Sequence, residues 1–118
     1  MSARPLIAVT GSRHYCWPER VHRYLDRVLE RHPTMVLIHG GASGVDSIAD
    51  AWALACGVPT KVYPADWDKH DRAAGPIRNR EMARAGLTGC IAWPGGAGTA
   101  DMVRQCRAAD VPVWEVSP

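Results

Sequence analysis

Three glycines within four residues make the segment from Pro94 to Thr99 the strongest candidate for chemistry in this sequence. It follows a short apolar run at residues 89–93 and precedes a helical pattern that begins near Ala100. Glycine costs roughly 0.5–1 kcal/mol relative to alanine inside a regular element, so the cluster indicates a place where the backbone approaches another group. At a strand-to-helix turn, free amides and the helix dipole favour an anion such as phosphate. The segment therefore predicts a phosphate-binding loop, although a tight turn without a ligand has the same composition.

Two further glycine-containing segments also follow apolar runs. Residues 11–13 read Gly-Ser-Arg, and residues 40–44 read Gly-Gly-Ala-Ser-Gly. In an open parallel sheet every strand-to-helix loop lies at the carboxyl edge, so we expect the three loops to gather around a ligand crevice. The sequence has no G-x-G-x-x-G turn after its first apolar run and no G-x-x-x-x-G-K-[ST] loop. A standard dinucleotide fold and a triphosphate hydrolase are therefore disfavoured.

Charged and aromatic side chains near these loops complete the candidate site. Arg13 is either a phosphate counter-charge or a solvated loop arginine. Asp46, three residues after Ser43, is either part of a helix capping box or an acceptor for ribose hydroxyls. Asp101, also in a predicted first helical turn, has the same two interpretations. Trp67, in a long connection, either stacks on a base or plugs the loop.

A basic segment at residues 69–84 carries Arg78 and Asn79 near the start of a predicted helix. Basic residues outnumber acidic ones in this segment, so it predicts the basic side of the crevice. One or two of its arginines are expected to neutralise phosphate, and the others to be helix-surface charges. The complete set of predicted ligand-binding residues is Gly11, Ser12, Arg13, Gly40, Gly41, Ala42, Gly44, Asp46, Trp67, Arg78, Asn79, Pro94, Gly95, Gly96, Gly98 and Thr99.

Composition limits the possible classes of protein. The chain has 118 residues, a formal net charge of +2, 47% hydrophobic residues and 22% charged residues. This length fits one domain over residues 1–118, and the small net charge does not by itself indicate a nucleic-acid partner. No apolar run approaches the ~20 residues that cross a bilayer, and residues 1–5 lead into no signal-peptide core, so we expect a cytoplasmic protein without a membrane partner.

The four cysteines are scattered along the chain and form no cluster with zinc-ligand spacing. Cys56 and Cys106 fall on the apolar faces of predicted helices, and Cys90 falls in a predicted strand, so they are expected to be small buried hydrophobic residues. A reactive thiol is the less favoured interpretation of Cys16. We expect neither a metal ion nor a cofactor.

Hydrophobic periodicity predicts the elements that position these residues. Short apolar runs predict strands at 5–9, 35–38, 60–63, 89–93 and 111–116. Apolar residues at spacings of three and four predict four helices: from Pro18 to before Pro33, up to Gly57, at 76–85 and at 100–109. Residues 64–75 form a long connection. The alternation of strands and helices predicts an α/β fold: a single Rossmann-like domain with an open five-stranded parallel sheet and helices on both faces.

Four motifs, in order along the chain, resemble the SMF/LOG-like (SLOG) superfamily. They are the runs at residues 9–13 (VTGSR), 39–46 (HGGASGVD), 74–82 (AGPIRNREM) and 94–102 (PGGAGTADM). The run PADW at 64–67, followed by AGPIRN, resembles the YspA-like YAcAr group of small bacterial and phage proteins. The resemblance implies a sheet ordered 3-2-1-4-5 with a crevice between the first and fourth strands. It also implies a homodimer that binds a nucleotide or nucleotide derivative, such as an ADP-ribose-like ligand.

The resemblance leaves more than one function open. The lonely-guy phosphoribohydrolases of the superfamily carry P-G-G-x-G-T-x-x-E, whose glutamate takes part in cleaving the N-glycosidic bond of a nucleoside monophosphate. Met102 occupies the matching position here, and a methionine cannot transfer a proton. Binding of a nucleoside phosphate or ADP-ribose-like small molecule, as in a ligand sensor, is therefore favoured.

Hydrolysis of a nucleoside 5′-monophosphate is the first alternative, with Asp101 and Glu81 as candidate catalytic residues and Asp46 as a further acid that could help. Binding of single-stranded DNA is the second, because the Gly-Ser-Arg turn and residues 78–80 also resemble DNA-processing protein A. A net charge of +2 does not favour a nucleic-acid partner.

Overall fold

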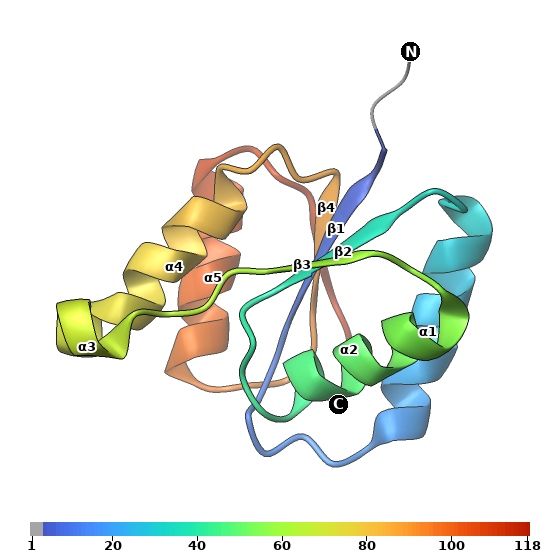
Figure 1. The fold of residues 1–118 in the computed structure, drawn as a ribbon, viewed down its shortest axis with the longest axis horizontal. Helices are drawn as coiled ribbons and strands as arrows, with labels where there is room; N and C mark the ends of the chain where they lie inside the picture. The colour runs from blue at the N-terminus through green and yellow to red at the C-terminus, as the bar shows by residue number, and fades with distance from the viewer. Residues whose placement is uncertain (1–3) are drawn as a thin grey trace.

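Five strands form one parallel sheet in the computed structural model, which describes residues 4–118 (Figure 1). The first three residues, part of the segment predicted to lack a signal-peptide core, lie outside the described residues. The strands are β1 (Leu6–Thr10), β2 (Val36–His39), β3 (Thr60–Val62), β4 (Gly89–Ala92) and β5 (Val113–Glu115). Their order is β3-β2-β1-β4-β5, as predicted. The strand order reverses at β1, so the loops after β1 and β4 flank the position where open α/β sheets form a crevice.

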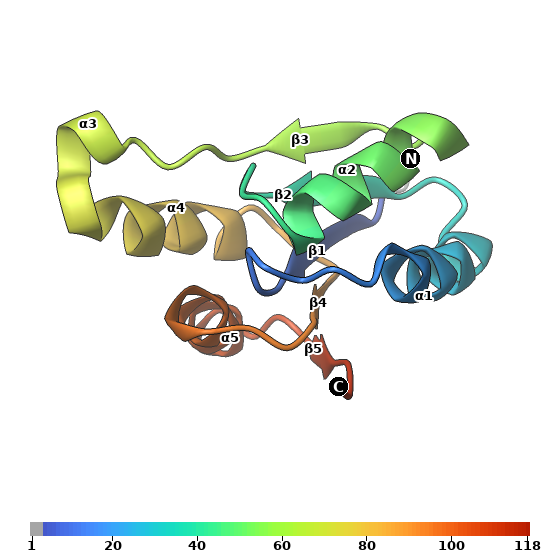
Figure 2. The same cartoon turned by 90° about the horizontal axis from the view of Figure 1, so that it is seen from below.

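Two pairs of helices cover the two faces of the sheet (Figure 2). One face carries α1 (Pro18–Arg31) and α2 (Val45–Cys56), and the other carries α4 (Ala74–Ala83) and α5 (Ala97–Ala108). Pro18 occupies the start of α1, where its missing amide costs no hydrogen bond. Gly57 ends α2 in the left-handed conformation, with φ 70° and ψ 24°.

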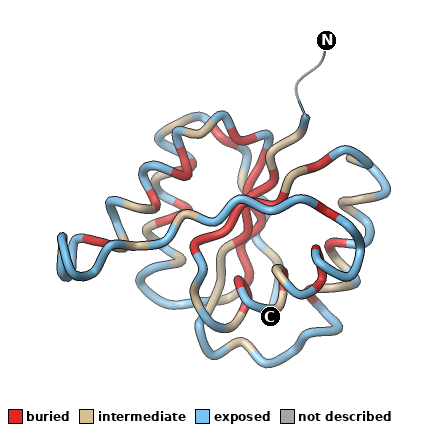
Figure 3. The backbone as a smooth tube through the Cα atoms, in the orientation of Figure 1, coloured by how far each residue is buried: buried red, intermediate tan, exposed pale blue. Residues whose placement is uncertain are grey.

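Side-chain alternation along β1 divides the core into two clusters. Ile7 and Val9 pack in the cluster under α1 and α2, whereas Ala8 packs in the cluster under α4 and α5. Ala8 lies in register with Ile38 of β2 and Cys90 of β4, which face the same way. Because successive side chains of a strand point to opposite faces, strands covered on both sides are apolar throughout. The three central strands, β2, β1 and β4, are accordingly the most buried part of the sheet (Figure 3), whereas the edge strand β3 is exposed and β5 is mostly exposed.

The predicted boundaries differ from the structure at the rim. Helix α5 begins at Ala97 rather than near Ala100, and α4 begins at Ala74 rather than at residue 76. Gly98 and Gly75 lie inside these first turns, where glycine is unfavourable, so the sequence pattern placed both starts too late. The long connection at 64–75 contains the unpredicted short helix α3 (Trp67–His70) and the 3-10 turn η1 (Asp71–Ala73).

The cysteines were predicted to be buried, and this is wrong for Cys16 and Cys56. Cys90 and Cys106 are buried, while Cys16 and Cys56 are exposed. Cys56 continues the apolar face of α2, but it is the last residue of that helix, in an exposed stretch at residues 54–57. Among the helices of residues 4–118, none combines the length and the apolar character that crossing a membrane requires.

Candidate functional site

The three glycine-containing loops meet at Ser12, at the carboxyl edge of the sheet. We name them loop 1 (residues 11–17), loop 2 (residues 40–44) and loop 3 (residues 93–96). The Ser12 amide donates a hydrogen bond to the Pro94 carbonyl at 3.0 Å, and the Ser12 carbonyl accepts one from the Val45 amide at 3.3 Å. A Cβ on Gly44 would overlap the Ser12 carbonyl oxygen, and one on Gly95 would lie 2.8 Å from the Ser12 nitrogen. The predicted gathering of the loops is confirmed.

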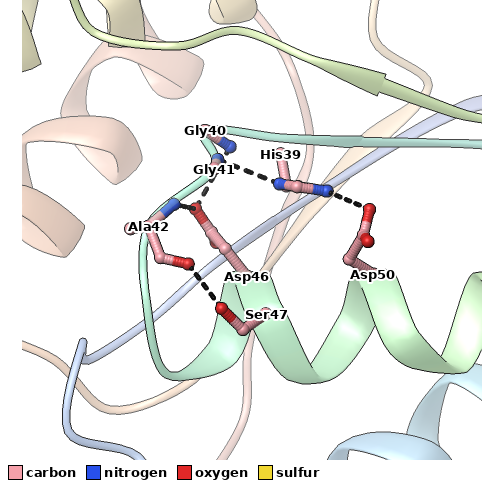
Figure 4. A network of polar contacts seen from close by, with 7 residues as sticks. All are labelled: His39, Gly40, Gly41, Ala42, Asp46, Ser47 and Asp50. Carbon is pink, nitrogen blue, oxygen red and sulfur yellow. Dashed lines mark hydrogen bonds and ion pairs between the residues drawn. The ribbon is translucent and has the colours of Figure 1, made fainter.

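The amides of loop 2 bond to side chains of the protein itself (Figure 4). The buried Asp46 carboxylate accepts hydrogen bonds from the amides of Gly40 at 3.1 Å and Ala42 at 3.2 Å through the same oxygen. The Gly41 amide donates to Nδ1 of His39 at 2.9 Å. Loop 2 therefore reaches the rim as predicted, but three of its five amides, those of Gly40, Gly41 and Ala42, already donate to side chains of the protein and are not free to hold a phosphate.

His39 extends this network into α2. Because Nδ1 accepts from Gly41, the other ring nitrogen, Nε2, carries the proton and donates to Asp50 at 2.8 Å. The His39 side chain is almost fully buried, whereas half of the Asp50 side chain is exposed. Sequence reasoning missed this pair, because a histidine at a strand end and an aspartate eleven residues later carry no local signal.

The structure contradicts one of the two predicted interpretations of Asp46, the helix cap. The N-cap of α2 is Gly44, and no side chain caps that helix end, so the capping box predicted at Ser43 is wrong. The carboxylate points back into loop 2, where its hydrogen bonds leave less capacity for ribose hydroxyls. Burial raises the pKa of Asp46, while its bonds to Ala42 and Gly40 and the charge of Arg78 act in the opposite direction.

Arg78 and Asn79 tie α4 to loops on both sides. Nη1 of Arg78 donates to the Gly40 carbonyl at 2.7 Å and to the Tyr63 carbonyl at 3.3 Å. Burial lowers the pKa of Arg78, and the nearby Asp46 charge counteracts this. The buried Asn79 amide donates to Asp101 at 2.9 Å and to the Gly98 carbonyl at 3.3 Å. Arg78 thus braces loop 2, and Asn79 braces the start of α5.

Loop 3 differs from loop 2 because it leads into a helix, α5, whose first amides have no hydrogen-bond acceptor among the described residues. No side chain caps α5, and within residues 4–118 no hydrogen bond is donated by the amides of residues 96–99. A Cβ on Gly96 or Gly98 would meet no atom within 4 Å, whereas one on Gly95 would overlap the Thr99 hydroxyl. Gly95 is required by packing. Gly96 and Gly98 have no such requirement within the protein.

Comparison with known proteins places these loops in a family. A sequence model of the YspA, cpYpsA-related SLOG family (YAcAr) matches residues 5–70, which include loops 1 and 2. The Gene 61 protein of Mycobacterium phage D29 is 40% identical over 117 residues, covering 91% of this chain and 92% of that protein. The chain belongs to the YspA, cpYpsA-related SLOG family.

The X-ray structure of TM1055 supports the fold of this SLOG-family protein. It superposes with a TM-score of 0.71 over 92% of this chain and 72% of that chain. The two sequences are 16% identical, so the likeness shows the Rossmann-like fold alone.

The acids proposed for hydrolysis are unequally placed in this SLOG-family chain. Met102, at the position of the lonely-guy glutamate, is fully buried in the core cluster under α4 and α5. Asp101 accepts from Asn79 and from Arg104 at 3.4 Å, and 16% of its side chain is exposed. Glu81 is exposed, on the side of α4 opposite Asn79 and Met82. The structure therefore brings Asp101 to the start of α5 but does not bring Glu81 there.

The side chains of Arg13 and Trp67, which were predicted to contact the ligand, both lie away from the point where the three loops meet. Arg13 is exposed on loop 1, and its carbonyl accepts a hydrogen bond from the Ser43 hydroxyl at 3.2 Å. Trp67 begins α3, is 57% exposed, and lies 3.5 Å from the position of a Cβ on Gly75. Neither side chain is packed into the contact point of the three loops at Ser12.

A cavity of about 390 Å³ on the α1 side of loop 3 was not predicted. It is lined by Ser12, His14, Tyr15, Cys16, Trp17, Arg20, Pro94, Gly95 and Pro118. The available signal was three ring-bearing side chains within residues 14–17, between a strand and a proline-started helix. Within residues 4–118, no group of three or more His, Cys, Asp or Glu side chains is placed to hold a metal ion.

Proposed function

We propose that this protein binds a nucleoside phosphate or an ADP-ribose-like ligand, with a phosphate on the backbone amides at the start of α5. The observation that carries this proposal is the presence of Gly96 and Gly98 where nothing in the protein requires glycine. Gly98 lies inside the first turn of α5, where alanine would make the helix more stable. Close approach of a ligand to the backbone explains why glycine occupies both positions.

The difference between loops 2 and 3 supports this location. In loop 2, the negative charge near the helix end comes from Asp46, which already bonds to Gly40 and Ala42. At α5, the unbonded amides and the helix dipole favour an anion from outside the protein. Arg13 is exposed on the adjacent loop 1 and is available as a counter-charge, whereas Arg78 is held by backbone carbonyls.

Gly96→Val is the variant that tests this function. Because a Cβ at residue 96 meets no protein atom, the variant is expected to fold, while its two methyl groups fill the space proposed for the phosphate. Isothermal titration calorimetry with AMP and ADP-ribose should show binding to the wild type and a loss of roughly 100-fold or more in the variant, about 3 kcal/mol. Ala51→Val, an equally β-branched change on the exposed surface of α2, is the matched control.

Equal affinity of the wild type and Gly96→Val, with unchanged melting temperatures, would contradict the phosphate site. The same mixtures, analysed by chromatography after incubation, test for cleavage. We expect no free base, because Met102 is buried where the lonely-guy enzymes keep their glutamate. Base release that disappears in Asp101→Asn would instead favour hydrolysis.

A further inference from the structure

The cavity beside α1 borders loop 3, the segment that leads into the proposed phosphate site at the start of α5. Ser12, Pro94 and Gly95 line it, and these residues also form the contact between loops 1 and 3. Gly96 and the free amides of α5 follow immediately along the chain. A ligand whose phosphate rests on α5 can therefore extend its remaining part past Gly95 into this cavity.

The walls contributed by loop 1 and α1 are suited to a flat ring. Trp17 lines the cavity with an indole that is 53% exposed, and the Arg20 guanidinium carbon lies 5.3 Å from the ring centroid. This cation–π contact orients the indole at the cavity wall. Tyr15 and His14 add a phenol and an imidazole, which can both stack and form hydrogen bonds.

We propose that this cavity is the nucleobase subsite, with Trp17 as the stacking platform. The inference rests on the proposed function, because it takes the ligand to be a nucleoside phosphate anchored on α5. A volume of about 390 Å³ lies near the lower end of the range for ligand pockets, roughly 300–1,000 Å³, and suits one base with its sugar. Because the Trp17 ring is largely exposed, packing within the protein buries little of its apolar surface. Stacking against a base would remove more of that surface from water.

Two ligands that differ only in the base separate this subsite from the phosphate site. AMP and ribose 5-phosphate are titrated by calorimetry into the wild type, Trp17→Ala, Trp17→Phe and Gly96→Val. Trp17→Ala is expected to weaken AMP binding roughly 5- to 150-fold, the equivalent of the ~1–3 kcal/mol of one stacked base, and to leave ribose 5-phosphate binding unchanged. Trp17→Phe keeps an aromatic face and should recover most of the affinity.

Each other result has a distinct meaning. Unchanged AMP affinity in Trp17→Ala, with loss in Gly96→Val, would overturn the base subsite and leave the proposed function intact. Loss in Trp17→Ala with full affinity in Gly96→Val would keep the base subsite and overturn the phosphate site. Equal weakening of AMP and ribose 5-phosphate in Trp17→Ala would assign Trp17 a structural role and overturn the subsite. If none of AMP, GMP, CMP, UMP and ADP-ribose binds the wild type, both proposals are wrong.

Discussion

Replacing Gly44 with alanine is expected to lower the free energy of unfolding by about 3–5 kcal/mol, through backbone strain and overpacking together. Gly44 has φ 72° and ψ −126°, a conformation that residues with a side chain rarely adopt. Its Cβ would also overlap the backbone of Ser12 and Arg13, which cannot rotate away as a side chain can. The substitution is therefore expected to force loops 1 and 2 apart. Urea denaturation of the wild type and the variant measures the loss.

Gly57→Ala is the control for a positive φ without steric overlap. Gly57 also has a positive φ, of 70°, but a Cβ there meets no atom within 4 Å. Only the cost of the left-handed conformation applies, about 1–2 kcal/mol. Equal losses in the two variants would mean that the contact between loops 1 and 2 contributes nothing to the cost at Gly44.

Removing the Asp46 carboxylate should have the second-largest effect on stability. Asp46→Ala leaves the amides of Gly40 and Ala42 without their acceptor, which is expected to cost about 2–4 kcal/mol. Asp46→Asn keeps an acceptor oxygen in the same place and also removes a buried charge. It should remain within about 1 kcal/mol of the wild type at neutral pH. Chemical denaturation of both variants distinguishes a requirement for the acceptor from a requirement for the charge.

The difference in stability between the wild type and Asp46→Asn should depend on pH, and the direction of this dependence follows from the pKa of Asp46. Burial raises the pKa of Asp46 above its usual 3.8, so the folded protein holds this proton more tightly than the unfolded chain does. Its stabilising contribution is complete below the unfolded pKa and is lost as the pH rises through the folded pKa. The stability of the wild type relative to Asp46→Asn should therefore increase from about pH 7 to about pH 4. A decrease over this range would mean that the folded pKa is depressed.

The sheet and its rim could be predicted from the sequence, because apolar runs, helical periodicity and glycine placement are local signals. The order of the strands followed from the motif resemblance, since periodicity does not say which strands are neighbours. The role of Asp46 could not be predicted, because an aspartate in a first helical turn has the same local pattern whether it caps its helix or bonds to the preceding loop. Its true partners, Gly40 and Ala42, are set by how loop 2 turns back.

The cavity was missed for a related reason. Trp17 and Arg20 lie three residues apart around the start of α1, a spacing that equally describes an ordinary surface pair. Only the approach of loop 3, through Pro94 and Gly95, makes their surface concave. Such long-range contacts form because the sheet places β1 beside β4. The local sequence around Trp17 and Arg20 contains no signal for them.

Gly40 shows how rigid this rim is before any ligand arrives. Its amide bonds to Asp46 of α2, and its carbonyl accepts from Arg78 of α4, so one peptide segment is held by helices from opposite faces of the sheet. A loop fixed from both layers loses little conformational freedom when a ligand binds beside it. Less of the interaction free energy is then spent on ordering the protein, which favours tight binding by a small molecule that makes few contacts.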